Sequence, residues 1–405
     1  MSYDNYSVID CDGHIVESVA EMAEFMSARI RQHATKPARN RQGVFPSLDG
    51  MHFALHEENA VTKKRVTASE YRPGSGEDWL AFLDRAKIER TVLFTSEGLS
   101  VGFIQIPKYA VEVCRAYNDY VYHRFAKLSD RLRPMALIPM QDVPAAVSEL
   151  RRAVKDLGLP GAMLPSCGLP LHLAHDTYWP VYEEAEKLDC PLALHGGANC
   201  QGAGLETFTN FTASHILHHP IPLMVGIIGF IYHGVLDRFP KLKVAFMEGG
   251  VGWLASLLDR AERDENYFDP ADQPGNRVRD YLKSGRILLG CEGSEHTIAY
   301  LAKRVGVQCF AYASDYPHEV DLPAAQHEIE EVAERDDLTV EERQAVDRYA
   351  RARSPSPALR EGVRFRMRCP LTLTLSPTKT WWRGNVSSRL QADTYRTPRL
   401  AGEGC

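Results

Sequence analysis

The sequence predicts an α/β fold: a distorted (β/α)8 TIM barrel with an insertion after its first strand and an irregular C-terminal tail. Three observations lead to this prediction. Short apolar runs typical of buried strands recur along the chain, segments of helical periodicity lie between most of them, and three of these runs end in metal-binding residue types. Strands that alternate with helices indicate parallel βα units. Eight such units suit a closed barrel, and a doubly wound open sheet is the alternative.

The predicted strands are short and apolar. They span residues 8–11, 90–95, 134–139, 161–165, 191–195, 243–248, 287–291 and 309–314. Two of the intervening helices are well marked. Residues 147–157 carry apolar side chains at helical spacing and stop before Gly158, as a helix with a C-terminal glycine does, and residues 178–188 behave similarly.

Composition excludes several classes of function. The chain has 405 residues, of which 44% are hydrophobic and 25% charged, as in ordinary globular proteins. A formal net charge of -6 gives no basic footprint for nucleic acid. We identify no run long and apolar enough to span a bilayer and no secretory signal at the N-terminus, so we expect a cytoplasmic protein without nucleic-acid or membrane partners. The 9 cysteines are scattered, without a Cys-x-x-Cys pair, and are expected to be reduced thiols.

Three segments place metal-type ligands where predicted strands end. They read Asp-Cys-Asp-Gly-His at residues 10–14, Leu-His-Gly-Gly at 194–197 and Ser-Asp-Tyr-Pro-His at 314–318. In a barrel of parallel strands these ends converge on one face, where active sites are built. Side chains two apart on a strand share a face, so Asp12 and His14 should point the same way. A carboxylate and an imidazole suit a divalent ion such as zinc, manganese or iron. The alternative for this first segment is a loop with an Asp turn and a surface histidine.

These residues resemble those of the amidohydrolase-2 branch of the amidohydrolase superfamily, which includes aminocarboxymuconate-semialdehyde decarboxylase and the resorcylate-type decarboxylases. The matching segments are residues 8–17, 191–197, 235–253 and 313–318, and the likeness runs from about Ser7 to the region of Glu341. The resemblance implies a distorted TIM barrel. It also implies a metal set for one divalent ion, with zinc as the first choice and manganese or iron as alternatives. That set is Asp12, His14, His195 and Asp315.

The resemblance also bears on metal count and on catalytic residues. Binuclear members usually need a carboxylated lysine at the end of the fourth strand, and residues 163–166 read Met-Leu-Pro-Ser, so one ion is expected. Glu248 stands where many decarboxylating relatives place a histidine. It is expected to do acid–base work if burial raises its pKa, and a bracing role is the alternative. His215 is expected to touch substrate, while His218 and His219 are expected to be structural or exposed. His318 either faces the pocket or caps the strand end.

The resemblance implies one of two enzymatic reactions, and in both the expected substrate is a small-molecule carboxylate. The preferred one is non-oxidative decarboxylation of a small aromatic or unsaturated carboxylic acid. The alternative is hydrolysis by an activated water whose proton Asp315 accepts. A second alternative is an inactive or unstable product, because the family's closing C-terminal segment is altered here. A homodimer is left open.

The domain boundaries follow from shifts in pattern. Residues 1–353 are predicted to form the metal-dependent barrel domain. Within it, residues 20–75 are polar, do not fit the alternation and are expected to lie over the barrel mouth. The alternative is a peripheral subdomain without substrate contact. From Arg353 the periodicity stops, and the basic, proline-broken stretch 354–405 is expected to be a disordered tail outside the barrel.

Limited proteolysis tests the expected tail. Ordering a backbone costs roughly 1–2 kcal/mol per residue, which a segment poor in periodic apolar residues does not offset. We therefore expect trypsin to cut first near residues 360–368 and to leave a resistant core that keeps its metal. A tail as protected as the barrel, or loss of metal when the tail is trimmed, would show that this ending is part of the fold.

Overall fold

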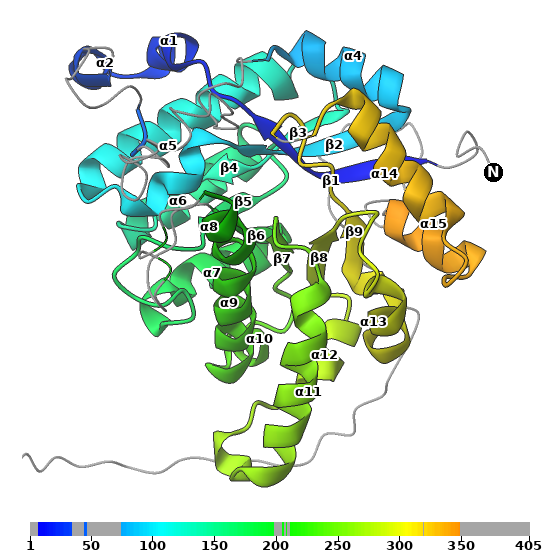
Figure 1. Ribbon diagram of the computed structural model, residues 1–405. Helices are drawn as coiled ribbons and strands as arrows, with labels where there is room; N and C mark the ends of the chain where they lie inside the picture. The colour runs from blue at the N-terminus through cyan, green and yellow to red at the C-terminus, as the bar shows by residue number, and fades with distance from the viewer. Residues whose placement is uncertain are drawn as a thin grey trace, which may run out of the picture. The chain divides into compact units, whose positions relative to one another are not determined.

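The computed structural model describes residues 7–34, 44–46, 74–197, 205, 208, 211–318 and 320–348 (Figure 1). All of them belong to the contact unit Met1–Cys369. Most of the predicted insertion at 20–75 and the whole tail from residue 354 lie outside the described residues. The boundaries drawn for these two segments therefore stay predictions.

All eight predicted strands are present, one of them divided in two. The strands are β1 Val8–Ile15, β2 Ile88–Thr95, β3 Leu132–Pro134, β4 Ala136–Leu137, β5 Ala162–Pro165, β6 Leu192–His195, β7 Val244–Met247, β8 Ile287–Cys291 and β9 Phe310–Tyr312. The predicted strand 134–139 is divided at Met135. Its amide donates to the Leu93 carbonyl at 2.8 Å, whereas the amide of Ala136 donates to the Gly161 carbonyl at 2.9 Å. At this point the chain therefore changes neighbours.

Every strand pair is parallel and follows chain order, as a barrel requires. One sheet has the order β1-β2-β3 and the other the order β4-β5-β6-β7-β8-β9. The first and last strands then meet. The His14 amide donates to the Tyr316 carbonyl at 2.7 Å, and the Asp315 amide donates to the Asp12 carbonyl at 2.8 Å. This closure confirms the barrel and removes the open-sheet alternative, in which the two end strands lie apart.

Helices surround the strands, as Figure 1 shows. They are α1 Val19–Met22, α2 Ala28–Ala34, α4 Gly76–Ala86, α5 Pro107–Val121, α6 Val143–Lys155, α7 Trp179–Leu188, α8 Phe211–His218, α9 Pro220–Tyr232, α10 Val235–Arg238, α11 Gly252–Tyr267, α12 Val278–Lys283, α13 Ile298–Val305, α14 Leu322–Glu334 and α15 Val340–Arg348. The two helices predicted from periodicity are α6 and α7. The last helix, α15, contacts both β1 and β9 and so covers the seam where the barrel closes (Figure 1).

Helices α8 and α9 correct one statement of the sequence analysis. Among the described residues, the helical stretch Thr212–Tyr232 is long and apolar enough to cross a membrane by length and composition, with a mean hydropathy of 1.4. In the structure 56% of the most apolar 18-residue part of this stretch is buried. Leu223, Ile227 and Phe230 are fully buried, and a Cβ on Gly226 would lie 2.1 Å from the Leu194 side chain. Packing on the barrel core accounts for the apolar composition of this helix.

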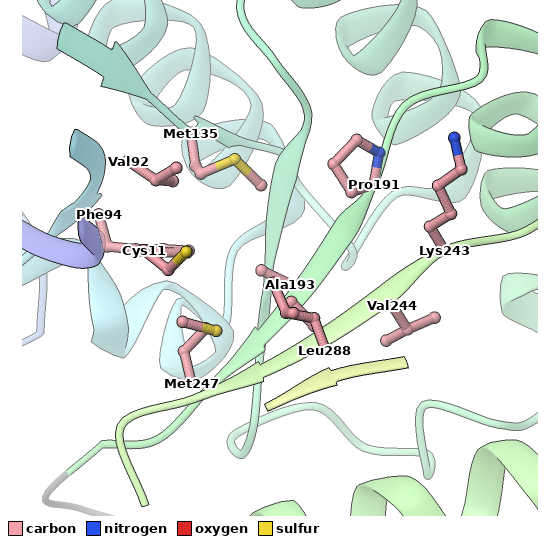
Figure 2. Close-up of a pocket in the computed structure, with 11 residues that line it drawn as sticks. Cys11, Val92, Phe94, Met135, Pro191, Ala193, Lys243, Val244, Met247 and Leu288 are labelled. Atoms are coloured by element: carbon pink, nitrogen blue, oxygen red, sulfur yellow. The ribbon is translucent and has the colours of Figure 1, made fainter. Parts of the chain in front are cut away.

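The barrel interior beneath the ligand-bearing strand ends is apolar. A pocket of about 30 Å³ lies there. Figure 2 shows the side chains that line it, which include Cys11, Phe94, Met247 and Leu288. Lys243 lies at the amino end of β7 and pairs with Asp189 at 2.7 Å. Such a lining offers little to a carboxylate, so the chemistry belongs to the opposite, carboxyl ends of the strands.

Candidate metal centre

The four residues predicted to be metal ligands converge at the barrel mouth. Asp12 and His14 come from β1, His195 ends β6, and Asp315 follows β9. Asp12 Oδ1 lies 3.0 Å from His195 Nε2 and 3.5 Å from His14 Nε2. Asp315 Oδ1 lies 3.3 Å from His14 Nε2. For comparison, ligands placed tetrahedrally about 2.0–2.2 Å from one zinc ion are about 3.3–3.6 Å apart.

The hydrogen bonds of the two histidines fix which ring nitrogen faces the site. His14 Nδ1 lies 3.1 Å from the Thr95 carbonyl, and His195 Nδ1 lies 3.0 Å from the Gly196 carbonyl. A carbonyl oxygen only accepts, so both Nδ1 atoms carry the hydrogen. Each Nε2 therefore faces a carboxylate oxygen. Histidines anchored through Nδ1 to a backbone carbonyl in this way are typical of metal sites.

Unpaired buried atoms point to the same conclusion. Asp12 Oδ2 and His14 Nε2 are buried and have no hydrogen-bond partner among the described residues. Buried polar atoms of this kind are costly unless something compensates them. Two imidazoles and two carboxylates fit a divalent cation such as zinc or manganese. The residues present therefore suit the metal that the sequence analysis expected.

Glu248 lies beside this set, at the end of β7. Its Oε2 is 3.1 Å from His195 Nδ1 and its Oε1 is 3.4 Å from His219 Nδ1. Burial by itself would raise the pKa of Glu248, but His219 and His195 outweigh it and hold the pKa well below its usual range. The acid–base role expected from the sequence depends on a raised pKa of Glu248, and this condition is not met. Glu248 is an ionised carboxylate at neutral pH, suited to act as a base or a cation ligand.

The three neighbouring histidines of α8 and α9 divide into two kinds. His218 is buried and lies 3.2 Å from both the Ser214 hydroxyl and the Leu205 carbonyl, as a structural residue would. His219 was expected to be structural or exposed, but it is 6% exposed and faces Glu248. The His219 ring centroid is 4.4 Å from that of His215, so the two rings lie on the same side of the mouth. Burial lowers the pKa of His215, so its ring is neutral at pH 7.

His318 faces the site and holds Asp315. Its Nδ1 lies 2.9 Å from Asp315 Oδ1, its Nε2 lies 2.9 Å from the Ser96 hydroxyl, and its ring lies over that of His14 with centroids 3.9 Å apart. Of the two roles considered for His318, the structure favours the one that faces the pocket. The Asp315 side chain is 22% exposed, which makes it the most open of the four predicted ligands.

Residues 9–349 match the family model described as amidohydrolase. The protein belongs to this amidohydrolase family. A gamma-resorcylate decarboxylase of Rhizobium radiobacter is 35% identical to this amidohydrolase over 261 residues, which are 59% of this chain and 76% of that enzyme. A 2-amino-3-carboxymuconate-6-semialdehyde decarboxylase of Dictyostelium discoideum is 25% identical over 262 residues, 64% of this chain and 71% of that enzyme.

Solved structures support the fold of the amidohydrolase. An amidohydrolase from Mycobacterium avium subsp. paratuberculosis K-10 superposes with a TM-score of 0.66 at 16% identity, covering 85% of this chain and 96% of that one. A dihydroxybenzoic acid decarboxylase from Polaromonas sp. JS666, with bound manganese and 2-nitroresorcinol, gives a TM-score of 0.59 at 19% identity and covers 84% of this chain and 94% of that one. The predicted family and fold are confirmed.

Sequence reasoning missed one carboxylate that supports the predicted metal ligands of this amidohydrolase. Asp10 is fully buried and accepts hydrogen bonds from the Thr91 hydroxyl at 2.7 Å, the Asp12 amide at 3.1 Å, and both the amide and the hydroxyl of Ser314 at 3.0 Å. Burial raises the pKa of Asp10 to about 6. A charged residue inside an apolar strand was the available signal, because such residues are buried only when they are paired. Asp10 ties β1 to β2 and to the segment that carries Asp315.

Two site residues hold an unusual backbone conformation. Glu248 has φ of 57° and Asp315 has φ of 52°, in the left-handed region that residues other than glycine rarely adopt. Glu248 directly follows β7, and Asp315 lies three residues after β9. The turn of the backbone at each position directs the side chain into the mouth. Conformations of this kind cost about 1–3 kcal/mol and cluster at functional sites.

We expect the amidohydrolase to need a glycine at position 196, because neighbouring residues pack closely against its backbone under the site. A Cβ there would lie 2.5 Å from the Glu248 carbonyl oxygen and 3.0 Å from His219 Nδ1. Gly196→Ala should therefore displace the His195 and His219 side of the mouth, lower the free energy of unfolding by about 1–3 kcal/mol and weaken metal binding. Urea unfolding and metal analysis measure both effects.

Gly197→Ala is the matched control for this prediction. Among the described residues, a Cβ on Gly197 would meet only the Leu99 Cβ, at 3.9 Å, which is an ordinary contact. This variant should keep both stability and metal. Equal behaviour of the two variants would contradict the proposed close approach at Gly196.

Proposed function

We propose that this amidohydrolase is a metal-dependent decarboxylase of a small aromatic or unsaturated carboxylic acid. The observation that carries the proposal is the convergence of two imidazoles and two carboxylates beside His318, which lies 2.9 Å from both Asp315 Oδ1 and the Ser96 hydroxyl. The decarboxylases among its relatives support the choice of reaction. A cytoplasmic location, drawn from the sequence, is part of the same proposal.

Asp12, His14, His195 and Asp315 would hold the cation. When bound, the cation supplies positive charge that attracts a carboxylate and stabilises negative charge on the substrate. Two imidazoles and two carboxylates accommodate zinc, our first choice from the sequence, as well as iron or the manganese found in a solved relative. Metal analysis of the purified protein distinguishes these three.

Asp315 is the group we propose to deliver the proton. In decarboxylation the bond from the ring or chain carbon to the carboxylate breaks, its electron pair stays on that carbon, and a proton replaces the departing carbon dioxide. Asp315 Oδ1 faces the mouth, and His318 lies between it and the Ser96 hydroxyl at 2.9 Å on each side. His318 can therefore return a proton to Asp315 after each turnover. Glu248 stays ionised on the other side of His195, and His215 borders the mouth near it.

Turnover assays test the reaction. Metal-loaded protein is incubated with a panel of aromatic and unsaturated carboxylic acids, beginning with 2,6-dihydroxybenzoate, the ligand of one solved relative. Carbon dioxide release is followed together with hydrolysis of esters and lactones. Carbon dioxide release that needs the metal supports the proposal. Hydrolysis without carbon dioxide release would favour the hydrolase alternative, with Asp315 accepting the proton of water.

Folding and metal content are measured on the same sample. Correctly folded, metal-loaded protein that turns over none of these substrates would count against both reactions. An aggregated product that binds no metal would instead favour the second alternative of the sequence analysis, an unstable or inactive chain.

A further inference from the structure

A second group of metal-type ligands lies next to the first. His215, His219 and Glu248 each offer a ligand atom, and these atoms all lie within 4.8 Å of one another. The two histidines are four residues apart around the junction of α8 and α9, with ring centroids 4.4 Å apart. Glu248 enters from β7, with Oε1 3.4 Å from His219 Nδ1. The group therefore joins one helical turn to one strand end.

The residue types and their spacing suit a divalent cation. Two histidines four apart on one helical face, joined by a carboxylate, form a common zinc-binding arrangement. Three protein ligands leave a coordination position open for water or substrate, as in catalytic rather than structural sites. Zinc and manganese both accept a set of two imidazoles and one carboxylate.

The hydrogen bonding of His219 and Glu248 is incomplete in a way that points to a ligand. His219 is 6% exposed, and among the described residues neither of its ring nitrogens has a hydrogen-bond partner. Glu248 Oε2 is also buried without one. Although Oε2 lies 3.1 Å from His195 Nδ1, the hydrogen of that nitrogen is directed at the Gly196 carbonyl. Unsatisfied buried groups of this kind destabilise the folded state, and a cation bound to them would remove that cost.

The first ligand set does not account for these atoms. Asp12, His14, His195 and Asp315 converge through other atoms, and His195 reaches that set through Nε2 rather than through the Nδ1 that faces Glu248. Gly196 leaves room for the His219 ring, because a Cβ there would lie 3.0 Å from His219 Nδ1. Glu248 also offers a ligand atom within 4.8 Å of those of His14, Asp315 and His318, so the two sets adjoin at Glu248, whereas His215 and His219 belong to the second set alone.

We propose that His215, His219 and Glu248 form a second divalent-cation site beside the Asp12, His14, His195 and Asp315 set. The sequence analysis expected one ion because no lysine follows the fourth strand. That reasoning concerns a pair of ions bridged by a carboxylated lysine, and the second set draws its donors from the junction of α8 and α9 and from β7 instead. The proposal concerns metal content, so it does not depend on which reaction the enzyme catalyses.

Metal stoichiometry tests the proposal. Purified full-length protein is stripped with chelator, reloaded with zinc or manganese alone, freed of excess metal and measured for ions per chain. The unaltered protein should bind two ions. His215→Ala and His219→Ala should each bind one, His14→Ala should also bind one, and His14→Ala combined with His215→Ala should bind none. His327→Ala, on the exposed face of α14, should still bind two.

A second measurement needs no variant. Manganese ions in neighbouring sites couple magnetically, so the fully loaded protein should give a coupled electron paramagnetic resonance spectrum that His215→Ala converts to an uncoupled one. Saturation of the unaltered protein at one ion would overturn the proposal, as would an uncoupled spectrum at full loading. Two ions retained in folded His215→Ala and His219→Ala proteins would overturn it as well. Circular dichroism checks that each variant is folded.

Discussion

His14→Ala is expected to abolish turnover and to remove the cation held with Asp12, His195 and Asp315. His14 Nε2 lies 3.5 Å from Asp12 Oδ1 and 3.3 Å from Asp315 Oδ1, so its ring joins the two carboxylates of the set. Its loss leaves these carboxylates to repel each other and leaves an open, weakly held ion. Loss of a group that only supports a ligand typically costs 10- to 100-fold, so removing the ligand itself should cost at least about 100-fold in activity.

Metal analysis and turnover assays on the same sample check this prediction. His327→Ala is the control, because that histidine lies on α14 with a side chain 71% exposed. It should match the unaltered protein in both measurements. A folded His14→Ala protein that keeps its full metal content and turnover would show that His14 is not a ligand, and the metal set would have to be redrawn around Glu248 and His318.

Glu248→Gln is expected to reduce turnover by about 100- to 10,000-fold, the range usual for loss of a group that handles protons. Glutamine keeps the shape of the side chain but carries no charge, so it neither accepts a proton nor balances the charge of His219. The contacts of Glu248 with His195 and His219, at 3.1 and 3.4 Å, place this charge at the centre of the histidine cluster. Rates at saturating substrate and metal measure the effect.

Glu328→Gln is a matched control for this change. Burial raises the pKa of Glu328 to about 8, so this carboxyl group is largely uncharged at pH 7 and glutamine resembles its prevailing form. Its turnover should be unchanged. Unchanged turnover in Glu248→Gln as well would assign Glu248 a bracing role, the alternative raised by the sequence.

The convergence of the four predicted metal ligands could be foreseen from the sequence because a barrel places strand ends on one face. Asp12, His14, His195 and Asp315 each follow or end an apolar run, so their convergence needed only the fold class and the order of the strands. The same reasoning located the strands themselves. It did not foresee the division at Met135, because a change of hydrogen-bonding neighbour leaves no mark on apolar periodicity.

Other parts of the site depended on contacts that sequence spacing does not report. The position of His219 follows from the path of the chain between β6 and α9, and from the space that Gly196 leaves for its ring. The direction of the pKa shift of Glu248 depends on two histidines that lie 53 and 29 residues earlier in the chain. Burial alone gave the wrong sign, because the charges of those neighbours outweigh desolvation.

The Asp10 carboxylate has a consequence for how the protein is made. It binds the amide of Ser314 across a separation of 304 residues, immediately before Asp315. A ribosome that adds about 5–20 residues per second needs roughly 15–60 s to cover that distance. Throughout that time the emerging polypeptide carries Asp12 and His14 without Asp315. Tight capture of the cation must therefore follow completion of the barrel, and metal content becomes a measure of how many molecules have finished folding.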